Sequence, residues 1–177
     1  NSSAFKLPGE HNLQNLLLAT AALIEIGLSA KEIERNLISF NGLSHRLEEI
    51  DRIQNMHIYN DSKATNFEAS TTGIKALTPP TILIAGGRIK KGEAINWLKE
   101  IEARVSSIVL FGESAIELRE LINQSKFNGT ITCHKVLEEA VYSAIEISKF
   151  KKANNILFSP ACSSFDQYNN FEERGDH

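Results

Sequence analysis

Three polar segments carry most of the side chains that could do chemistry, and each follows a short apolar run. They are D-S-K-A-T-N at residues 61–66, G-G-R-I-K-K-G at 86–92 and S-P-A-C-S-S-F-D-Q at 159–167. Their lysines supply positive charge, and their serines and threonine supply hydroxyl donors. If the three segments meet in the fold, they can build a small site for an anionic ligand.

The elements around these segments alternate between strands and helices. Apolar runs predict strands at 56–60, 81–85, 106–111, 130–133 and 155–158. Helical periodicity predicts helices at 66–76, 95–105, 114–122 and 137–150, and Ser114 and Glu117 have the spacing of a capping box. The alternation predicts an α/β fold with a mostly parallel sheet. Ligands of such sheets bind beyond the carboxyl ends of the strands, which is where the three segments lie.

The first 42 residues follow a different pattern and contain no predicted strand. Apolar residues at helical spacing between positions 13 and 24 predict a helix that ends at Gly27. Ser29 and Glu32 have capping-box spacing at the start of a second helix, which Gly42 closes. The change near residue 43 predicts a domain boundary, with domains at 1–42 and 43–177. We expect the apolar face of the first helix to be exposed.

Composition and charge narrow the possible functions. A chain of 177 residues holds one domain, or one domain and part of another. A net charge of -3 gives no support to a nucleic-acid partner. No apolar window is long enough to span a membrane, so no membrane partner is expected. Cys133 and Cys162 lack metal-ligand spacing and suggest reduced thiols in a cytosolic protein. Because the chain starts at Asn1, we expect it to be cut from a longer one.

Each polar segment also has a purely structural interpretation. Asp61 and Asn66 could form only an Asx-turn and a helix cap. The Gly86–Gly87 pair could be only a tight turn. Gly92 is followed by Glu-Ala, so the 86–92 segment is not a Walker A loop, and no dinucleotide fingerprint is present. Three such segments fall at matching positions after strands, and this disfavours a purely structural role.

Taken together, these motifs resemble those of the Mur ligases, most closely the D-glutamate-adding members. The carrying motifs are the three segments above together with G-E-H-N-L-Q-N at 9–15, G-L-S-H-R at 42–46 and F-E-E-R-G at 171–175. They follow the family order over nearly the whole chain. The S-P-A-C-x-S-F-D-Q motif is specific to the D-glutamate-adding members.

The resemblance implies a cytoplasmic, monomeric, three-domain ligase whose small-molecule partners are ATP, D-glutamate and UDP-N-acetylmuramoyl-L-alanine. ATP, with Mg²⁺, would phosphorylate the L-alanyl carboxylate, and the amine of D-glutamate would displace phosphate. Residues 1–42 would be the last helices of the central, ATP-binding domain. Residues 43–177 would be the Rossmann-like, amino-acid-binding domain. The family's P-loop and magnesium ligands have no counterpart here, so we expect the 177 residues alone to be inactive, with no cofactor bound and no metal site.

The resemblance also implies roles for individual residues. The catalytic pair would be Lys63 and Arg46. The D-glutamate site would comprise Thr65, Lys90, Ser164 and the backbone of Phe171. The nucleotide would be contacted by Asn12, Asn15, His45, Arg46 and Asp61. Lys91 could replace Lys90, since the length of this loop varies in the family. From spacing alone, Asn12 and Asn15 suggest a plain helix cap, and His45–Arg46 could be an ordinary surface pair.

Two other functions fit less well. The first is a related amide ligase, such as a folate polyglutamate ligase or a Mur ligase for another amino acid, which the 159–167 motif disfavours. The second is a non-catalytic nucleotide-binding module, which predicts no coordinated amino-acid pocket.

Overall fold

The computed structural model describes residues 7–177, which form two compact units. The first ends at Leu43, and the second runs from Ser44 to His177. Assigning the first unit to an ATP-binding domain and the second to an amino-acid-binding domain stays a prediction.

The first unit is a pair of helices, α1 (Glu10–Glu25) and α2 (Ala30–Ile38). The capping box at Ser29 is confirmed, because its hydroxyl accepts from the Glu32 amide and the Glu32 carboxylate accepts from the Ser29 amide. Helix α2 ends at Ile38, before the predicted end at Gly42. Most of the apolar face of α1 is exposed, including Leu17 at 62%, as the sequence predicted.

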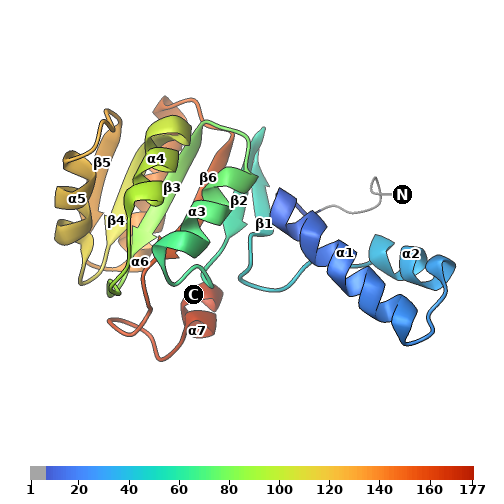
Figure 1. The fold of residues 1–177 in the computed structure, drawn as a ribbon. Helices are drawn as coiled ribbons and strands as arrows, with labels where there is room; N and C mark the ends of the chain where they lie inside the picture. Colours follow the sequence, from blue (N-terminus) through green and yellow to red (C-terminus); the bar gives the residue numbers. More distant parts are fainter. Residues whose placement is uncertain (1–6) are drawn as a thin grey trace. The chain divides into compact units, whose positions relative to one another are not determined.

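The second unit is a six-stranded sheet with helices on both faces (Figure 1). The strands are β1 (Glu48–Ile53), β2 (Met56–Asn60), β3 (Thr81–Gly86), β4 (Val105–Phe111), β5 (Thr130–His134) and β6 (Asn155–Ala161). The helices are α3 (Phe67–Ala76), α4 (Ile95–Arg104), α5 (Ala115–Asn123), α6 (Leu137–Phe150) and α7 (Phe171–Asp176). The strand order is β1-β2-β6-β3-β4-β5, and only the β1–β2 pair is antiparallel. The predicted α/β class with a mostly parallel sheet is therefore confirmed.

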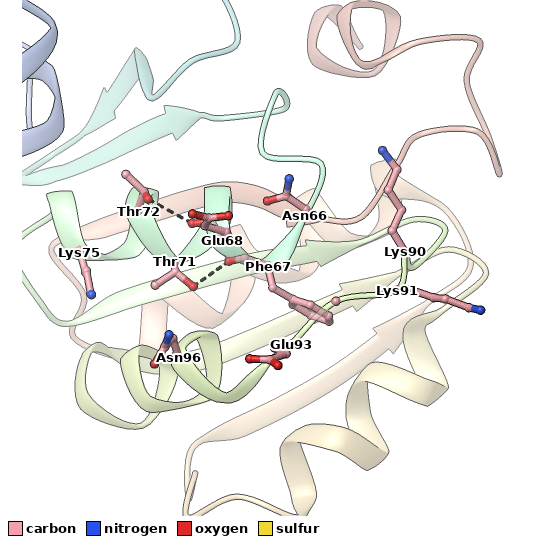
Figure 2. Close-up of a pocket in the computed structure, with 11 residues that line it drawn as sticks. Asn66, Phe67, Glu68, Thr71, Thr72, Lys75, Lys90, Lys91, Glu93 and Asn96 are labelled. Atoms are coloured by element: carbon pink, nitrogen blue, oxygen red, sulfur yellow. Dashed lines mark hydrogen bonds between the residues drawn. The ribbon is translucent and has the colours of Figure 1, made fainter.

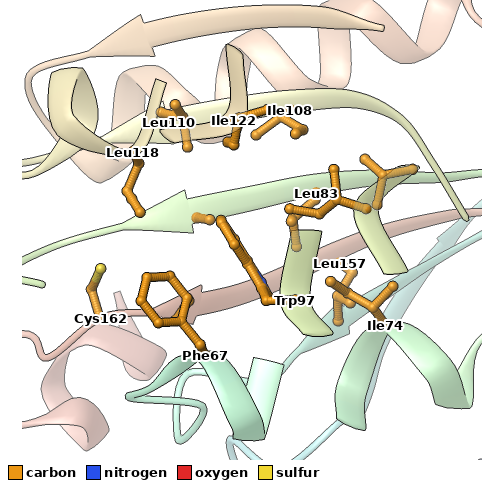
Figure 3. Close-up of a cluster of buried hydrophobic side chains, with 14 of the residues drawn as sticks. Phe67, Ile74, Leu83, Trp97, Ile108, Leu110, Leu118, Ile122, Leu157 and Cys162 are labelled. Atoms are coloured by element: carbon orange, nitrogen blue, oxygen red, sulfur yellow. The ribbon is translucent and has the colours of Figure 1, made fainter. Parts of the chain in front are cut away.

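Two apolar layers hold the sheet between the helices. Successive side chains of β3 point to opposite faces of the sheet. Leu83 packs against α3, α4 and α5 on one face, and Ile84 packs against α6 on the other. Trp97 of α4 is fully buried against Phe67 of α3, with ring centroids 5.0 Å apart (Figure 3). Its indole N–H donates to the Ser70 hydroxyl at 3.0 Å, so its polar edge is satisfied inside the core. This layer fixes the start of α3 and with it the loop that follows β2.

The capping box predicted at Ser114 is wrong. Ser114 is the residue before α5, but its side chain makes no capping bond to that helix. Its hydroxyl accepts instead from the backbone N–H of Ile89 at 2.8 Å, in the loop after β3. A long-range donor has therefore replaced the local one, and the hydroxyl ties two loops together.

Candidate functional site

The three polar segments meet because β2, β6 and β3 are neighbours in the sheet. All three strands are parallel, so their carboxyl ends lie at one edge. The loops after β3 and β6 pair directly, since the backbone N–H groups of Arg88 and Ser163 each donate to the other's carbonyl at 3.0 Å. The loop after β2 joins them where the Asp61 N–H donates to the Phe158 carbonyl at 2.8 Å. The expected convergence of the loops is confirmed.

Asp61 lies at the bottom of this junction and is only 6% exposed. Its carboxylate accepts from the Leu47 N–H at 3.1 Å and from the Ser159 hydroxyl at 2.7 Å. Burial raises its pKa from 3.8 to about 6, although these two hydrogen bonds and the charge of Arg46 act in the opposite direction. The side chain thus links the β2 loop to strand β6 and to Leu47, and it does not form the Asx-turn considered as its structural alternative.

The raised pKa of Asp61 predicts a pH-dependent stability. The protonated carboxyl stabilises the fold below the unfolded pKa of 3.8, and that contribution is lost as the pH rises through about 6. Relative to an Asp61→Asn variant, the wild-type free energy of unfolding should fall by roughly 2–3 kcal/mol across this interval. Urea titrations of both proteins between pH 4 and pH 7.5 measure the difference. Parallel curves would contradict the prediction.

Asn66 caps α3, since its side-chain oxygen accepts from the Ala69 N–H at 2.8 Å. Its structural interpretation is therefore confirmed. The cap fixes the end of the 61–66 loop, so that Lys63 and Thr65 are held between the end of β2 and the start of α3. Lys63 is exposed, and Thr65 is partly buried.

Arg174 of α7 is a buried cation that sequence reasoning missed. It is 1% exposed, and its acceptors among residues 7–177 are neutral. Its guanidinium donates to the carbonyls of Ser62 and Cys162, at 2.7 and 3.0 Å, and to the Ser62 hydroxyl at 3.1 Å. Burial lowers the pKa of Arg174 to about 10, so it stays charged at neutral pH. Arg174 thus joins the β2 loop, the β6 loop and α7.

The sequence does contain a local signal for α7. Asn170 lies three residues before Glu173, and its side chain accepts from the Glu173 N–H at 2.7 Å, as a helix cap does. The helix brings Phe171 to the site, where its carbonyl accepts from the Ser62 hydroxyl at 2.8 Å. The Lys63 ammonium lies 5.2 Å from the centroid of the Phe171 ring. Two of the predicted site residues are therefore in contact.

Ser164 and Cys162 lie in the β6 loop and are buried, at 2% and 0% exposure. Burial raises the pKa of the Cys162 thiol to about 12, against the opposing positive charges of Arg174 and Lys90. A thiol with this pKa is a poor nucleophile at neutral pH. Cys162 therefore contributes packing and a backbone carbonyl, and Ser164 is the residue of this loop predicted to bind ligand.

A pocket of about 570 Å³ lies beside these loops, between the starts of α3 and α4. Both candidate lysines of the 86–92 loop line it (Figure 2). Lys90 points toward the side on which Asn66 lies, whereas Lys91 points outward and away from it. The positive charge of Lys90 is close enough to Cys162 of the β6 loop to act on the pKa of its thiol. Geometry therefore favours Lys90 over Lys91 as the cation nearest to the junction of the loops.

His45 and Arg46 are positioned differently. The His45 ring is mostly buried, with Nδ1 3.2 Å from the Asn60 amide and Nε2 3.4 Å from the Asp176 carboxylate. Arg46 is exposed. The ordinary surface-pair interpretation therefore does not describe His45, which packs between β2 and α7.

Asn12 and Asn15 belong to the first unit. The Asn12 side chain is buried and donates to the Pro8 carbonyl at 2.7 Å, which stabilises the start of α1. Asn15 is exposed. Their nucleotide-binding role stays a prediction. Within residues 7–177, no three His, Cys, Asp or Glu side chains are grouped so as to hold a metal ion, and no helix is long and apolar enough to cross a membrane.

Comparison with known proteins finds similar sequences among curated ligases. The chain is 52% identical over all of its 177 residues to a UDP-N-acetylmuramoylalanine–D-glutamate ligase of Prochlorococcus marinus, and 45% identical over 174 residues to the ligase of that name from Gloeobacter violaceus. The chain matches the C-terminal portion of D-glutamate-adding Mur ligases. It spans 38% and 39% of the length of these two curated relatives. No protein-family model matches it.

The fold is similar to that of two ligases of known structure. A Mycobacterium tuberculosis folylpolyglutamate synthase complexed with ADP superposes with a TM-score of 0.73 at 14% identity, covering 97% of this chain and 40% of that protein. The UDP-N-acetylmuramate–alanine ligase of Thermotoga maritima gives 0.65 at 16% identity, covering 89% and 36%. At these identities the likeness establishes only the fold.

Proposed function

We propose that these 177 residues form the amino-acid-binding end of an ATP-dependent ligase that adds D-glutamate to UDP-N-acetylmuramoyl-L-alanine. The observation that carries the proposal is the 52% identity over the whole chain to a ligase of that name. In the proposed reaction, ATP phosphorylates the L-alanyl carboxylate. The D-glutamate amine then attacks the acyl phosphate, an amide forms, and phosphate leaves.

The junction of the loops has the chemistry that D-glutamate requires. D-glutamate brings two carboxylates, so its pocket needs a cation and several hydroxyl or amide donors. Lys90 is a cation that lines the pocket beside the loops, while Thr65 and Ser164 offer hydroxyls from the β2 and β6 loops. The side chain of Phe171 lies under Lys63, and its carbonyl is already engaged by Ser62. We assign Thr65, Lys90, Ser164 and the Phe171 backbone to D-glutamate.

The remaining roles belong to the same proposal. Lys63 and Arg46 are exposed cations at the sheet edge and suit the charge that develops on a transferring phosphoryl group. Asn12, Asn15, His45 and Asp61 are assigned to the nucleotide. The sequence contains no Walker A loop, and the described residues offer no metal-ligand group. Residues 7–177 therefore do not by themselves fit a magnesium–triphosphate.

The 177-residue chain alone is expected to show no ligase activity. We further propose that the complete enzyme is a cytoplasmic monomer. The two free cysteines agree with the cytoplasmic location.

A substrate comparison tests the proposal. The complete gene product that carries these residues should consume ATP in the presence of UDP-N-acetylmuramoyl-L-alanine and D-glutamate. L-lysine, meso-diaminopimelate and a folate with L-glutamate should not replace them. Turnover with one of the other amino acids would identify a different amide ligase. Nucleotide binding without turnover for any acceptor would identify a non-catalytic module.

Replacing Lys90 with alanine should raise the KM for D-glutamate. Loss of one charge-assisted hydrogen bond should cost about 1.5–3 kcal/mol, or roughly ten- to a hundredfold in KM. Initial rates against D-glutamate, at saturating ATP and UDP-substrate, measure the change. Lys91→Ala is the matched control, since the neighbouring Lys91 points away from the loops (Figure 2). A raised KM for D-glutamate in Lys91→Ala but not in Lys90→Ala would show that Lys91 has the role assigned to Lys90. An unchanged KM in both variants would contradict the assignment of the D-glutamate pocket.

A further inference from the structure

The last two residues of the 159–167 segment reach beyond the three loops described so far. Asp166 and Gln167 follow β6, yet their side chains contact the carboxyl ends of β4 and β5. In the sheet, β6 is separated from both strands by β3. The two side chains therefore extend the loop sideways across the edge of the sheet.

Asp166 makes the contact with the loop after β4. Its Oδ2 atom accepts from the backbone N–H of Glu113 at 3.1 Å. Gly112 leaves the space for this approach, because a Cβ at that position would lie 2.3 Å from the same oxygen. The other carboxylate oxygen, Oδ1, is buried and has no hydrogen-bond partner in the described part of the chain. A carboxylate held this way is oriented by the fold and is closed to solvent at that atom.

Gln167 makes the contact with the loop after β5. Its side-chain N–H₂ donates to the Lys135 carbonyl at 3.1 Å and to the Asp166 carboxylate at 3.3 Å. Its side-chain oxygen accepts from the Leu137 N–H, the first residue of α6, at 3.4 Å. Both ends of the amide are used, so its orientation is determined, and it braces Asp166.

These contacts fix the far end of a short arch that carries Ser164. The near end is the pairing of Ser163 with Arg88. At the far end, the backbone N–H of Gln167 donates to the Ser164 carbonyl at 3.1 Å. Only Ser164 and Phe165 lie between the two anchors, so the position of the Ser164 hydroxyl depends on both.

We propose that Asp166 and Gln167 are positioning residues that clamp the β6 loop onto β4 and β5 and thereby hold Ser164 in place for the amino-acid substrate. Neither side chain is assigned a contact with substrate. The consequence for substrate rests on the proposed D-glutamate function, whereas the clamp itself rests on the contacts above.

The test uses the complete gene product with Asp166→Ala, Asp166→Asn and Gln167→Ala. Glu138→Ala is the control, because Glu138 is exposed in the first turn of α6 at the same edge. Hydrogen exchange of peptides covering 159–168 reports the clamp without any substrate. Exchange should be faster in both alanine variants and close to wild type in Asp166→Asn, whose amide oxygen can still accept from Glu113.

Kinetics then report the consequence for substrate. The alanine variants should raise the KM for D-glutamate about five- to thirtyfold, as the loss of one or two buried hydrogen bonds implies, with the KM for ATP unchanged. Asp166→Asn should recover most of the loss. Unchanged exchange would overturn the clamp, and faster exchange with an unchanged KM for D-glutamate would overturn its positioning role. A wild-type enzyme that does not use D-glutamate would contradict the proposed function, while the exchange result would still decide the clamp.

Discussion

Replacing Gly86 with alanine is expected to cost about 3–6 kcal/mol of folding free energy. Gly86 is the last residue of β3 and has φ of +145°, which side chains rarely adopt. A Cβ there would lie 2.0 Å from the Phe111 carbonyl oxygen of the neighbouring strand. Relief would require β3 and β4 to separate, because backbone atoms cannot rotate aside. The melting temperature and the urea midpoint of the variant measure the loss.

Gly92→Ala is the matched control for this substitution. Gly92 lies in the loop that follows the same strand, and its added Cβ would meet only the Phe67 ring at 3.7 Å, an ordinary contact. The free energy of unfolding of the Gly92→Ala variant should differ from that of the wild type by less than about 1 kcal/mol. Similar losses for the two variants would mean that the close approach of β3 and β4 does not limit stability.

Arg174→Ala should destabilise the protein by about 3–5 kcal/mol. The substitution removes the donors to Ser62 and Cys162 and leaves those buried carbonyls without partners, in addition to a cavity. Arg174→Lys should recover only part of the loss, because a single ammonium cannot reproduce the spread of the guanidinium donors. Chemical denaturation of the three proteins gives the comparison.

The control for Arg174 is Arg52→Ala. Arg52 is exposed and forms an ion pair with Glu49 at 3.1 Å. Surface pairs of this kind contribute about 1 kcal/mol or less. If the two alanine variants lost equal stability, Arg174 would not be the element that joins the two loops to α7.

Much of the sheet could be predicted because its elements have local causes. Met56–Asn60 and Leu137–Phe150 form the strand and the helix expected from their apolar spacing. The β1 strand was missed because it is an edge strand, and all of its residues after Glu48 are exposed. Its pairing with β2 depends on a free strand edge, which the residues of Glu48–Ile53 do not encode as an apolar pattern.

In the candidate site, too, some features have local causes and others depend on the tertiary structure. The sequence by itself determined which segments carry the polar groups and that they follow strands, because strand ends and helix caps such as Asn66 depend on neighbouring residues. Only the tertiary structure decided that β6 lies between β2 and β3, so that the three loops meet. It also decided that Arg174 is buried against Ser62, 112 positions away in the sequence. The reason is physical: local spacing sets backbone propensity, whereas the burial and pairing of a polar side chain depend on partners that only the folded chain brings within reach.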